Sequence, residues 1–183
     1  MIDTVYIDMD GVLVDFLGRC WEKRAFDEKG RVDWKVVCEI GPDFWATMNW
    51  LPGSKEFLEI VVRECDKRGI EVGILSAIDV KYGELGKRLW CKWNTPFDNE
   101  HVIIVAHGAP ETNTHKRRGN PKGLDCSSHM VDNKSMYAKP GRLLIDDNMD
   151  NNAAFRARGG DTIQYDNPEQ ALLELMEKIT ADD

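Results

Sequence analysis

The sequence predicts an α/β fold in which a Rossmann-like parallel sheet is flanked by helices. Three observations support this fold class: short apolar runs typical of buried strands, helical patterns between these runs, and acidic residues where two of the runs end. Near-continuous apolar runs are typical of strands that are covered on both faces of a parallel sheet. Strands that alternate with helices are joined by right-handed crossovers in such a sheet. We therefore expect a ligand site beyond the carboxyl ends of the strands.

Length and charge restrict the class of protein. The chain has 183 residues, of which 24 are Lys or Arg and 32 are Asp or Glu, so the formal net charge is −8. This length suits one domain with at most a small inserted module. The negative charge argues against a protein that mainly coats nucleic acid or an anionic membrane. No apolar run approaches the roughly 20 residues that span a bilayer. The five cysteines are odd in number and form no C-x-x-C pair, which favours reduced thiols and a cytoplasmic location.

Five segments have the composition of strands. The first is Thr-Val-Tyr-Ile at 4–7, a β-branched and aromatic run that stops at an acidic segment. The others follow in chain order at 70–75, 102–105, 142–145 and 161–165.

Helical patterns occupy most of the segments between these strands, at 54–68, 80–94, 150–158 and 168–179. We expect Ser54 to cap the first of them and Gly69 to end it. Pro168 favours a helix start at that position, because its missing N–H group costs nothing in the first turn.

Two stretches do not fit the alternation of strands and helices. Residues 16–52 contain several large aromatic side chains, which favours a small helical cap over a flexible loop. Residues 106–132 are rich in Gly, Asn, Thr and basic residues and indicate an irregular insertion. We therefore predict a discontinuous core made of residues 1–15 and 53–183, with the cap inserted after the first strand.

Acidic and hydroxyl side chains lie at the ends of three predicted strands. Asp8 and Asp10 follow the first strand, Ser76 follows the second, and Asp146 and Asp147 follow the fourth. The carboxyl ends of parallel strands share one edge, so these side chains should converge. Crowded carboxylates repel one another unless a cation lies between them, and oxygen ligands suit Mg²⁺. The sequence therefore predicts a magnesium site at this edge.

Three of these segments resemble the motifs of a known superfamily. Residues 8–16, Asp-Met-Asp-Gly-Val-Leu-Val-Asp-Phe, resemble the first motif of the haloacid dehalogenase-like (HAD) phosphatases. Leu-Ser at 75–76 resembles their second motif, and Leu-Ile-Asp-Asp-Asn at 144–148 resembles their fourth. The resemblance implies a HAD-like core.

Two further segments narrow the resemblance to the 5'(3')-deoxyribonucleotidases. Residues 44–53, Phe-Trp-Ala-Thr-Met-Asn-Trp-Leu-Pro-Gly, are similar to the return from cap to core in that group. Residues 82–93 resemble its helix after the second motif. The resemblance covers most of the chain, and residues 106–132 are the clear exception.

The resemblance implies a Mg²⁺-dependent phosphatase that hydrolyses nucleoside monophosphates, in particular deoxyribonucleotides, through an aspartyl-phosphate. Asp8 would be the nucleophile, and Asp10 would protonate the leaving alcohol and later deprotonate water. Asp8, the backbone carbonyl of Asp10, and Asp146 would hold Mg²⁺, with Asp147 orienting them from behind. Ser76 would donate a hydrogen bond to a phosphate oxygen.

The family also uses a lysine to offset the negative charge of the phosphate. Lys134 lies well upstream of the fourth strand, as in the deoxyribonucleotidases, with a spacing to Asp146 slightly longer than the family pattern, and it is the preferred candidate. Lys139 lies closer to the strand and is the alternative, although a solvated turn is the simpler interpretation of its position.

Aromatic and basic residues give weaker signals. Phe44 and Trp45 could stack on a nucleobase, or they could form the apolar core of the cap. Lys116, Arg117 and Arg118 could bind the phosphates of a nucleic acid, although such a run is more often a solvated loop. The insertion also contains four residues that could bind Zn²⁺ but match no finger spacing: His107, His115, Cys126 and His129.

Two alternative functions stay open at this point. One is a phosphatase for polynucleotide ends or for another small metabolite, in which the basic insertion would contact the strand. The other is a module that binds a phosphorylated ligand without catalysis. The expected partner is a small phosphomonoester rather than a membrane, and the sequence is compatible with a monomer or a dimer.

Overall fold

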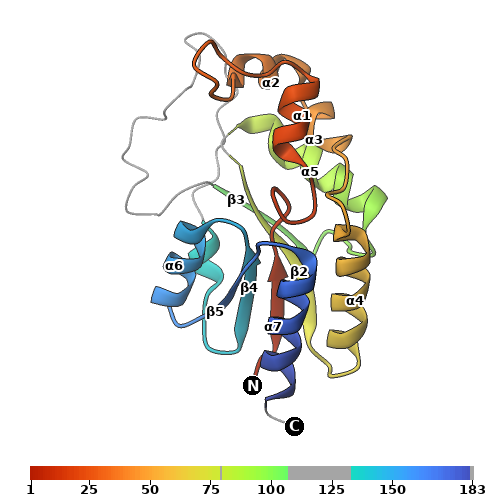
Figure 1. Cartoon of the computed structure of the whole chain (residues 1–183), viewed down its shortest axis with the longest axis vertical. Helices are drawn as coiled ribbons and strands as arrows, with labels where there is room; N and C mark the ends of the chain where they lie inside the picture. The colour runs from red at the N-terminus through yellow and green to blue at the C-terminus, as the bar shows by residue number, and fades with distance from the viewer. Residues whose placement is uncertain (79, 107–132, 182–183) are drawn as a thin grey trace.

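The structure is a computed structural model that describes residues 1–78, 80–106 and 133–181. Its five strands form one sheet in the order β3-β2-β1-β4-β5, and every pairing between neighbours is parallel. The strands are β1 (Thr4–Ile7), β2 (Glu71–Ile78), β3 (Val102–Ala106), β4 (Arg142–Asp146) and β5 (Asp161–Gln164). Helices flank this sheet, which confirms the predicted fold class (Figure 1).

Helices occupy the connections between the strands. Three short helices lie between β1 and the first long helix: α1 (Phe16–Glu22), α2 (Trp34–Ile40) and α3 (Asp43–Ala46). The remaining helices of the described residues are α4 (Ser54–Asp66), α5 (Lys81–Asn94), the 3₁₀ helix η2 (Lys134–Tyr137), α6 (Met149–Ala157) and α7 (Pro168–Thr180). Within the described ranges, no helix has the length and apolar character needed to cross a bilayer.

The two faces of the sheet are buried under different helices because side chains alternate along each strand. Val5 and Ile7 of β1 belong to the larger apolar cluster, which includes side chains of α4 and α7. Tyr6 faces the other way and packs in a smaller cluster with Phe155 of α6. The strands are therefore covered on both faces, as their continuous apolar composition predicted.

The cap helices α1, α2 and α3 lie beyond the carboxyl ends of the strands (Figure 1). Arg19 of α1 is 8% exposed, and its guanidinium group donates to the carbonyl oxygens of Asp43 and Phe44 at 3.1 and 3.0 Å. These bonds hold α1 against α3. The division into a core of residues 1–15 and 53–183 and a cap of residues 16–52 stays a prediction, because one apolar cluster runs through both parts.

The contact between α3 and α5 depends on glycine. A Cβ atom at Gly86 of α5 would lie 2.4 Å from the carbonyl oxygen of Pro42 and 2.8 Å from the Cβ atom of Trp45. The absence of a side chain therefore allows α5 to approach α3 closely. Trp90, one turn later, is fully buried, and its indole N–H donates to the carbonyl oxygen of Met48 at 2.9 Å.

Several local predictions need correction. Ser76 lies inside β2, which continues to Ile78, rather than after it. Gly53, with φ +77°, occupies the cap position of α4. The hydroxyl group of Ser54 instead donates to the carbonyl oxygens of Leu13 and Leu51, at 2.8 and 2.7 Å.

The cysteine prediction was partly wrong. Cys20, Cys65 and Cys91 are free and buried, as expected of reduced thiols. Cys38, however, is disulfide-bonded. Of the predicted insertion at 106–132, residue 106 ends β3, and residues 107–132 lie outside the described residues.

The packing of Gly86 gives a first prediction. Gly86→Ala should gain about 1 kcal/mol of helix propensity, yet we expect a net loss of about 1–3 kcal/mol because the new methyl group overlaps a backbone carbonyl. Urea unfolding would measure the change in the free energy of unfolding. Lys92→Ala, at an exposed position of the same helix, is the control and should change stability by less than about 0.5 kcal/mol. A more stable Gly86→Ala variant would contradict the packing argument.

Candidate active site

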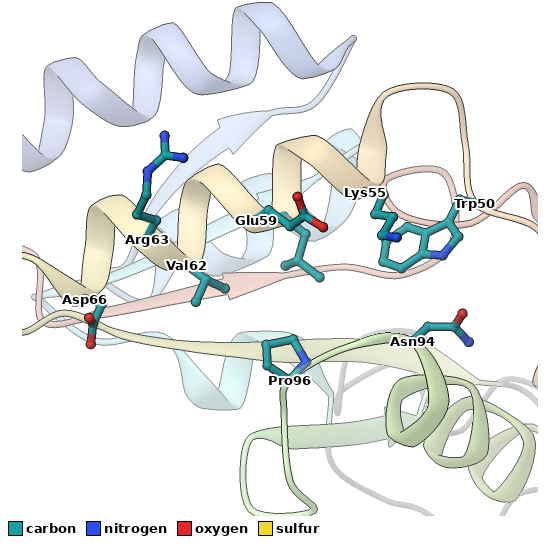
Figure 2. A pocket seen from close by; sticks show the side chains of 9 residues that line it. Trp50, Lys55, Glu59, Val62, Arg63, Asp66, Asn94 and Pro96 are labelled. Carbon is teal, nitrogen blue, oxygen red and sulfur yellow. The ribbon is translucent and has the colours of Figure 1, made fainter.

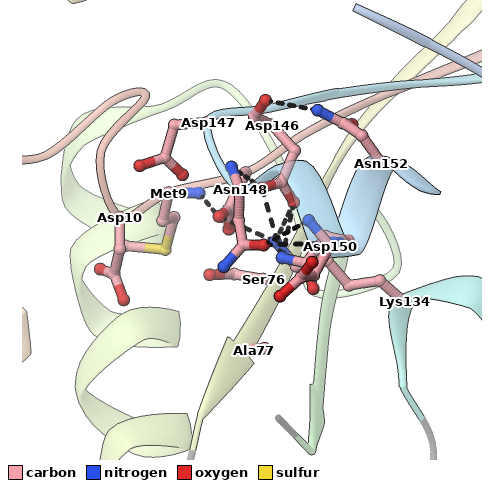
Figure 3. A network of polar contacts seen from close by, with 12 residues as sticks. Met9, Asp10, Ser76, Ala77, Lys134, Asp146, Asp147, Asn148, Asp150 and Asn152 are labelled. Carbon is pink, nitrogen blue, oxygen red and sulfur yellow. Dashed lines mark hydrogen bonds and ion pairs between the residues drawn. The ribbon is translucent and has the colours of Figure 1, made fainter. Parts of the chain in front are cut away.

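The structure brings six predicted polar residues together at the carboxyl edge of the sheet (Figure 3). They are Asp8, Asp10, Ser76, Lys134, Asp146 and Asp147. The strand register explains this convergence, because Ile7 of β1 is level with both Ile74 of β2 and Ile145 of β4. The residues that follow these positions therefore project from neighbouring strands at nearly the same height.

Lys134 connects two of the carboxylates. Its Nζ atom lies 2.8 Å from Oδ2 of Asp8 and 2.5 Å from Oδ2 of Asp146. The side chains of all three residues are at least nine-tenths buried. Lys139 is exposed and lies outside this cluster, so the geometry favours Lys134 as the lysine of the site.

A second buried lysine was missed by the sequence analysis. Lys87 of α5 is fully buried, and its Nζ atom donates to Oδ2 of Asp10 at 2.7 Å and to Oγ of Ser76 at 2.8 Å. A signal for it was present in the sequence. Gly83, Lys87 and Trp90 lie on one helix face, so Lys87 is a charged residue within an otherwise apolar stripe.

Asparagines of α6, which the sequence analysis also missed, hold Asp146. The Nδ2 atom of Asn151 donates to both carboxylate oxygens, at 3.3 and 3.1 Å, and Nδ2 of Asn152 donates to the backbone carbonyl at 2.9 Å. The backbone N–H of Asn148 donates to Oδ1 at 2.8 Å. These bonds fix the orientation of the Asp146 carboxylate.

The turn at Gly11, directly after Asp10, lies against the carboxylate of Asp147. Gly11 has φ +78°, a conformation that favours glycine. A Cβ atom there would lie 2.2 Å from Oδ2 of Asp147. The backbone conformation therefore favours glycine at this position, and a side chain here would also require the exposed carboxylate of Asp147 to shift.

The buried charges shift the pKa values of the carboxyl groups in different directions. Burial raises the pKa of Asp8, but the positive charges of Lys134 and Lys87 outweigh it, so the net effect is a lowered pKa. Burial and the charge of Asp8 raise the pKa of Asp10 against the opposing effect of Lys87. The surroundings therefore favour the ionised form of Asp8 and the protonated form of Asp10.

The other two carboxyl groups have raised pKa values. Burial, followed by the negative charge of Asp8, raises the pKa of Asp146. Burial and the charges of Asp8 and Asp146 raise the pKa of Asp147 to about 6. Both raised pKa values reflect the repulsion between neighbouring carboxylates, which a bound cation would reduce.

The donor set fits Mg²⁺. One oxygen atom from each of Asp8, Asp146 and Asp147 lies within 4.8 Å of the others. Carboxylate oxygens are the ligands that Mg²⁺ prefers in proteins. The resemblance implied that Asp147 lies behind the metal ligands, whereas one of its carboxylate oxygens belongs to the cluster itself. The carboxylate of Asp10 is held by Lys87, which leaves the predicted role of its backbone carbonyl as a metal ligand untouched.

The predicted aromatic contacts to substrate are not supported by the packing. Phe44 is fully buried and Trp45 is 2% exposed, and both belong to the main apolar cluster. Their rings meet edge-to-face with centroids 5.1 Å apart. This burial favours the alternative in which both rings form the core of the cap. Lys116, Arg117 and Arg118 lie outside the described residues, as do the four residues considered for Zn²⁺.

A separate pocket of about 310 Å³ lies between α4 and the end of α5 (Figure 2). It is lined by Trp50, Lys55, Leu58, Glu59, Val62, Arg63, Asp66, Asn94 and Pro96. It shares no residue with the polar cluster, and its charged side chains have both signs.

Comparison with solved structures supports the assignment of the fold. A HAD-superfamily hydrolase, subfamily IA, variant 1, from Geobacter sulfurreducens matches with a TM-score of 0.53 and 16% sequence identity, over 96% of this chain and 100% of that one. The chain has the fold of a HAD-superfamily hydrolase. No protein-family model matches the sequence, and a search of curated proteins gives no match.

A second similar structure contains a metal. It is the N-terminal part of a Bacteroides fragilis protein containing a phosphatase domain, complexed with Mg. The match has a TM-score of 0.50 and 14% identity. It covers 98% of this chain, which in turn spans only 40% of that one.

The turn at Gly11 gives a second prediction. In Gly11→Ala, the free energy of unfolding should fall by about 1 kcal/mol or more because of the left-handed backbone, and by a smaller further amount because the Asp147 carboxylate must shift. Gly30→Ala is the matched control, because Gly30 has φ +72° but open space around its Cβ position. Urea unfolding should show a larger loss for Gly11→Ala. Equal losses would mean that Asp147 does not restrict the turn.

The pKa of Asp147 gives a third prediction. Because folding raises this pKa from its ordinary value of 3.8 to about 6, the folded state binds the proton more tightly than the unfolded state. The contribution of Asp147 to stability therefore falls as pH rises from about 4 through 6. In metal-free protein at pH 7.5, Asp147→Asn should raise the melting temperature by about 2–5 °C.

The difference in melting temperature between Asp147→Asn and the wild type should shrink as the pH is lowered from 7 to 4. Added Mg²⁺ should raise the melting temperature of the wild type more than that of the variant. Glu59→Gln, at an exposed position of α4, controls for the general loss of negative charge. A variant that melts at or below the wild-type temperature at pH 7.5 without metal would contradict the crowding of carboxylates.

Proposed function

We propose that this chain is a Mg²⁺-dependent phosphatase that hydrolyses phosphate monoesters through an aspartyl-phosphate on Asp8. One observation carries the proposal. A buried carboxylate with a lowered pKa lies beside a lysine and two further carboxylates, at the carboxyl edge of a sheet with the HAD-superfamily fold. Fold alone does not specify an activity, so the proposal depends on these side chains.

In the first step, an oxygen of Asp8 attacks phosphorus while the bond between phosphorus and the alcohol oxygen breaks. Asp10 transfers its proton to that departing oxygen, and the alcohol leaves. The geometry suits this role for Asp10, because Oδ2 is held by Lys87 while Oδ1 is buried with no hydrogen-bond partner among the described residues. Its raised pKa favours the protonated form that the step needs.

In the second step, water attacks the phosphorus of the aspartyl-phosphate and its proton passes to Asp10. The bond between phosphorus and Asp8 breaks, so inorganic phosphate leaves and both carboxyl groups return to their starting states. Lys134 lies where it can offset negative charge on Asp8 and on the incoming phosphoryl group. Ser76, on the neighbouring strand, supplies a hydroxyl group toward Asp8.

Asp8, Asp146 and Asp147 are the residues that would hold Mg²⁺, with the backbone carbonyl of Asp10 as a further ligand by resemblance to the HAD phosphatases. Bound Mg²⁺ would reduce the repulsion between the substrate phosphate and the carboxylates. The asparagines of α6 would keep the Asp146 carboxylate in place for this role.

For the substrate, we propose nucleoside monophosphates, in particular deoxyribonucleotides. The support is the sequence similarity of residues 44–53 and 82–93 to the 5'(3')-deoxyribonucleotidases. Since Phe44 and Trp45 are buried, contact with a base would fall to other side chains of the cap. The cytoplasmic location, the oligomeric state and the role of the insertion stay as predictions.

The fourth prediction tests this function. Wild-type protein with Mg²⁺ should release phosphate from deoxynucleoside monophosphates, and chelation of the metal should abolish the release. Asp8→Asn should show no turnover above background, and Asp10→Asn should lose about 10²–10⁴-fold in kcat. Asp66→Asn, at an exposed position of α4, is the control and should retain full activity.

Parallel assays on a sugar phosphate and on a 5'-phosphorylated oligonucleotide would identify the substrate class. A clear preference for the oligonucleotide at moderate salt would favour a polynucleotide-end phosphatase. Tight Mg²⁺-dependent binding of the nucleotide without release of phosphate would favour a non-catalytic binding module. Full activity of folded Asp8→Asn would remove Asp8 as the nucleophile.

A further inference from the structure

Lys87 is fully buried, and every hydrogen of its ammonium group has an acceptor. Its Nζ atom contacts Oδ2 of Asp10 at 2.7 Å, Oγ of Ser76 at 2.8 Å and the backbone carbonyl oxygen of Ala77 at 2.8 Å. A lysine ammonium carries three donors, so none is left for the phosphate. The two site lysines therefore have different surroundings, because Lys134 bonds to Asp8 and Asp146.

We propose that Lys87 is a positioning residue that fixes the carboxylate of Asp10 and, through the hydroxyl group of Ser76, the carboxylate of Asp8. The proposal deepens the proposed function and rests on it. Lys87 acts on the reaction through these groups rather than by touching the substrate.

The link to Asp8 follows from the hydrogen-bonding capacity of the serine. A hydroxyl group has one donor and can accept from other groups. Oγ of Ser76 accepts from Lys87, so its own hydrogen is available for the carboxylate of Asp8, whose pKa the neighbouring hydroxyl group lowers. One ammonium group thus orients the nucleophile through Ser76 and the acid–base group directly.

The two carboxylate oxygens of Asp10 have different surroundings. Lys87 holds Oδ2, whereas Oδ1 is buried and has no hydrogen-bond partner in the part of the chain that the structure describes. Leaving a buried carboxylate oxygen unpaired is costly, so such an atom indicates a group kept for another partner. With Oδ2 fixed, Oδ1 is the oxygen that exchanges the proton with the leaving alcohol and with water.

The position of Lys87 is set by the packing of α5. Its neighbour Gly86 lies against the carbonyl oxygen of Pro42, and the ammonium group reaches β2 at Ala77. α5 is thereby held against the cap and the sheet at once. A residue anchored in this way can fix a carboxylate more precisely than a surface lysine with free rotamers.

Two substrates with different leaving groups can distinguish a positioning role of Lys87 from a merely structural role. Nitrophenolate departs from phosphorus without a proton, whereas the alcohol of a deoxynucleotide needs one. A misplaced Asp10 should therefore slow the first step for the nucleotide but spare it for p-nitrophenyl phosphate. The second step needs Asp10 for both substrates, so steady-state turnover of both should fall.

The fifth prediction uses Lys87→Met, which keeps the length of the side chain and removes its charge. For a deoxynucleoside monophosphate, kcat should fall about 10²-fold while KM changes less than about 3-fold. With p-nitrophenyl phosphate, the rate constant of the first turnover, measured by stopped flow, should stay within about 3-fold of the wild-type value. The steady-state rate that follows should be slower than in the wild type. Asp10→Asn should show the same pattern, and Lys92→Met, exposed on the same helix, should behave like wild type.

Circular dichroism and thermal melting would establish that each variant is folded. If Lys87→Met is unfolded, Lys87→Gln, which keeps a donor at the same position, takes its place in the same assays. An equal loss of the first turnover for both substrates, unchanged kinetics, or failure of both variants to fold would each overturn the proposal. Wild-type protein that releases no phosphate from either substrate would instead contradict the proposed function.

Discussion

The repulsion between carboxylates at one edge of the sheet is the constraint on which the rest of the site depends. Parallel topology brings Asp8 and Asp146 to the same height on neighbouring strands, and Asp10 and Asp147 follow them. Two unit charges 4 Å apart repel by about 4 kcal/mol at the effective dielectric typical of proteins. A fold that gathers such groups must supply positive charge close by, and it does so mainly with buried lysines and, as we propose, with Mg²⁺.

The positive charges come from outside the strands. One site lysine belongs to η2, just before β4, and the other belongs to α5, which is packed between the cap and the sheet. Lys134 lies between Asp8 and Asp146, while Lys87 donates hydrogen bonds to Asp10 and Ser76. The same charges that allow the cluster to fold also favour an ionised Asp8, which we propose as the nucleophile, beside an Asp10 carboxyl group with a raised pKa.

The sequence was sufficient for features that depend on local pattern and topology. Continuous apolar runs predicted the strands, and the rule that parallel strands end at one edge predicted the meeting of Asp8, Ser76 and Asp146. The sequence was insufficient where tertiary packing decides. Lys87 occupies a place in an apolar helix stripe, and only the approach of α5 to the sheet gives it polar partners. The burial of Phe44 depends likewise on the packing of the cap.

The central claim is that the gathered carboxylates make Asp8 a nucleophile that carries the phosphoryl group. Borohydride reduces an acyl phosphate to an alcohol, so a quenched reaction of the wild-type protein with Mg²⁺ and a phosphate monoester can be trapped and analysed by peptide mass spectrometry. Our account predicts homoserine at position 8, dependent on both substrate and Mg²⁺. Rapid release of phosphate with position 8 left as aspartate, or with the reduced residue elsewhere, would contradict it.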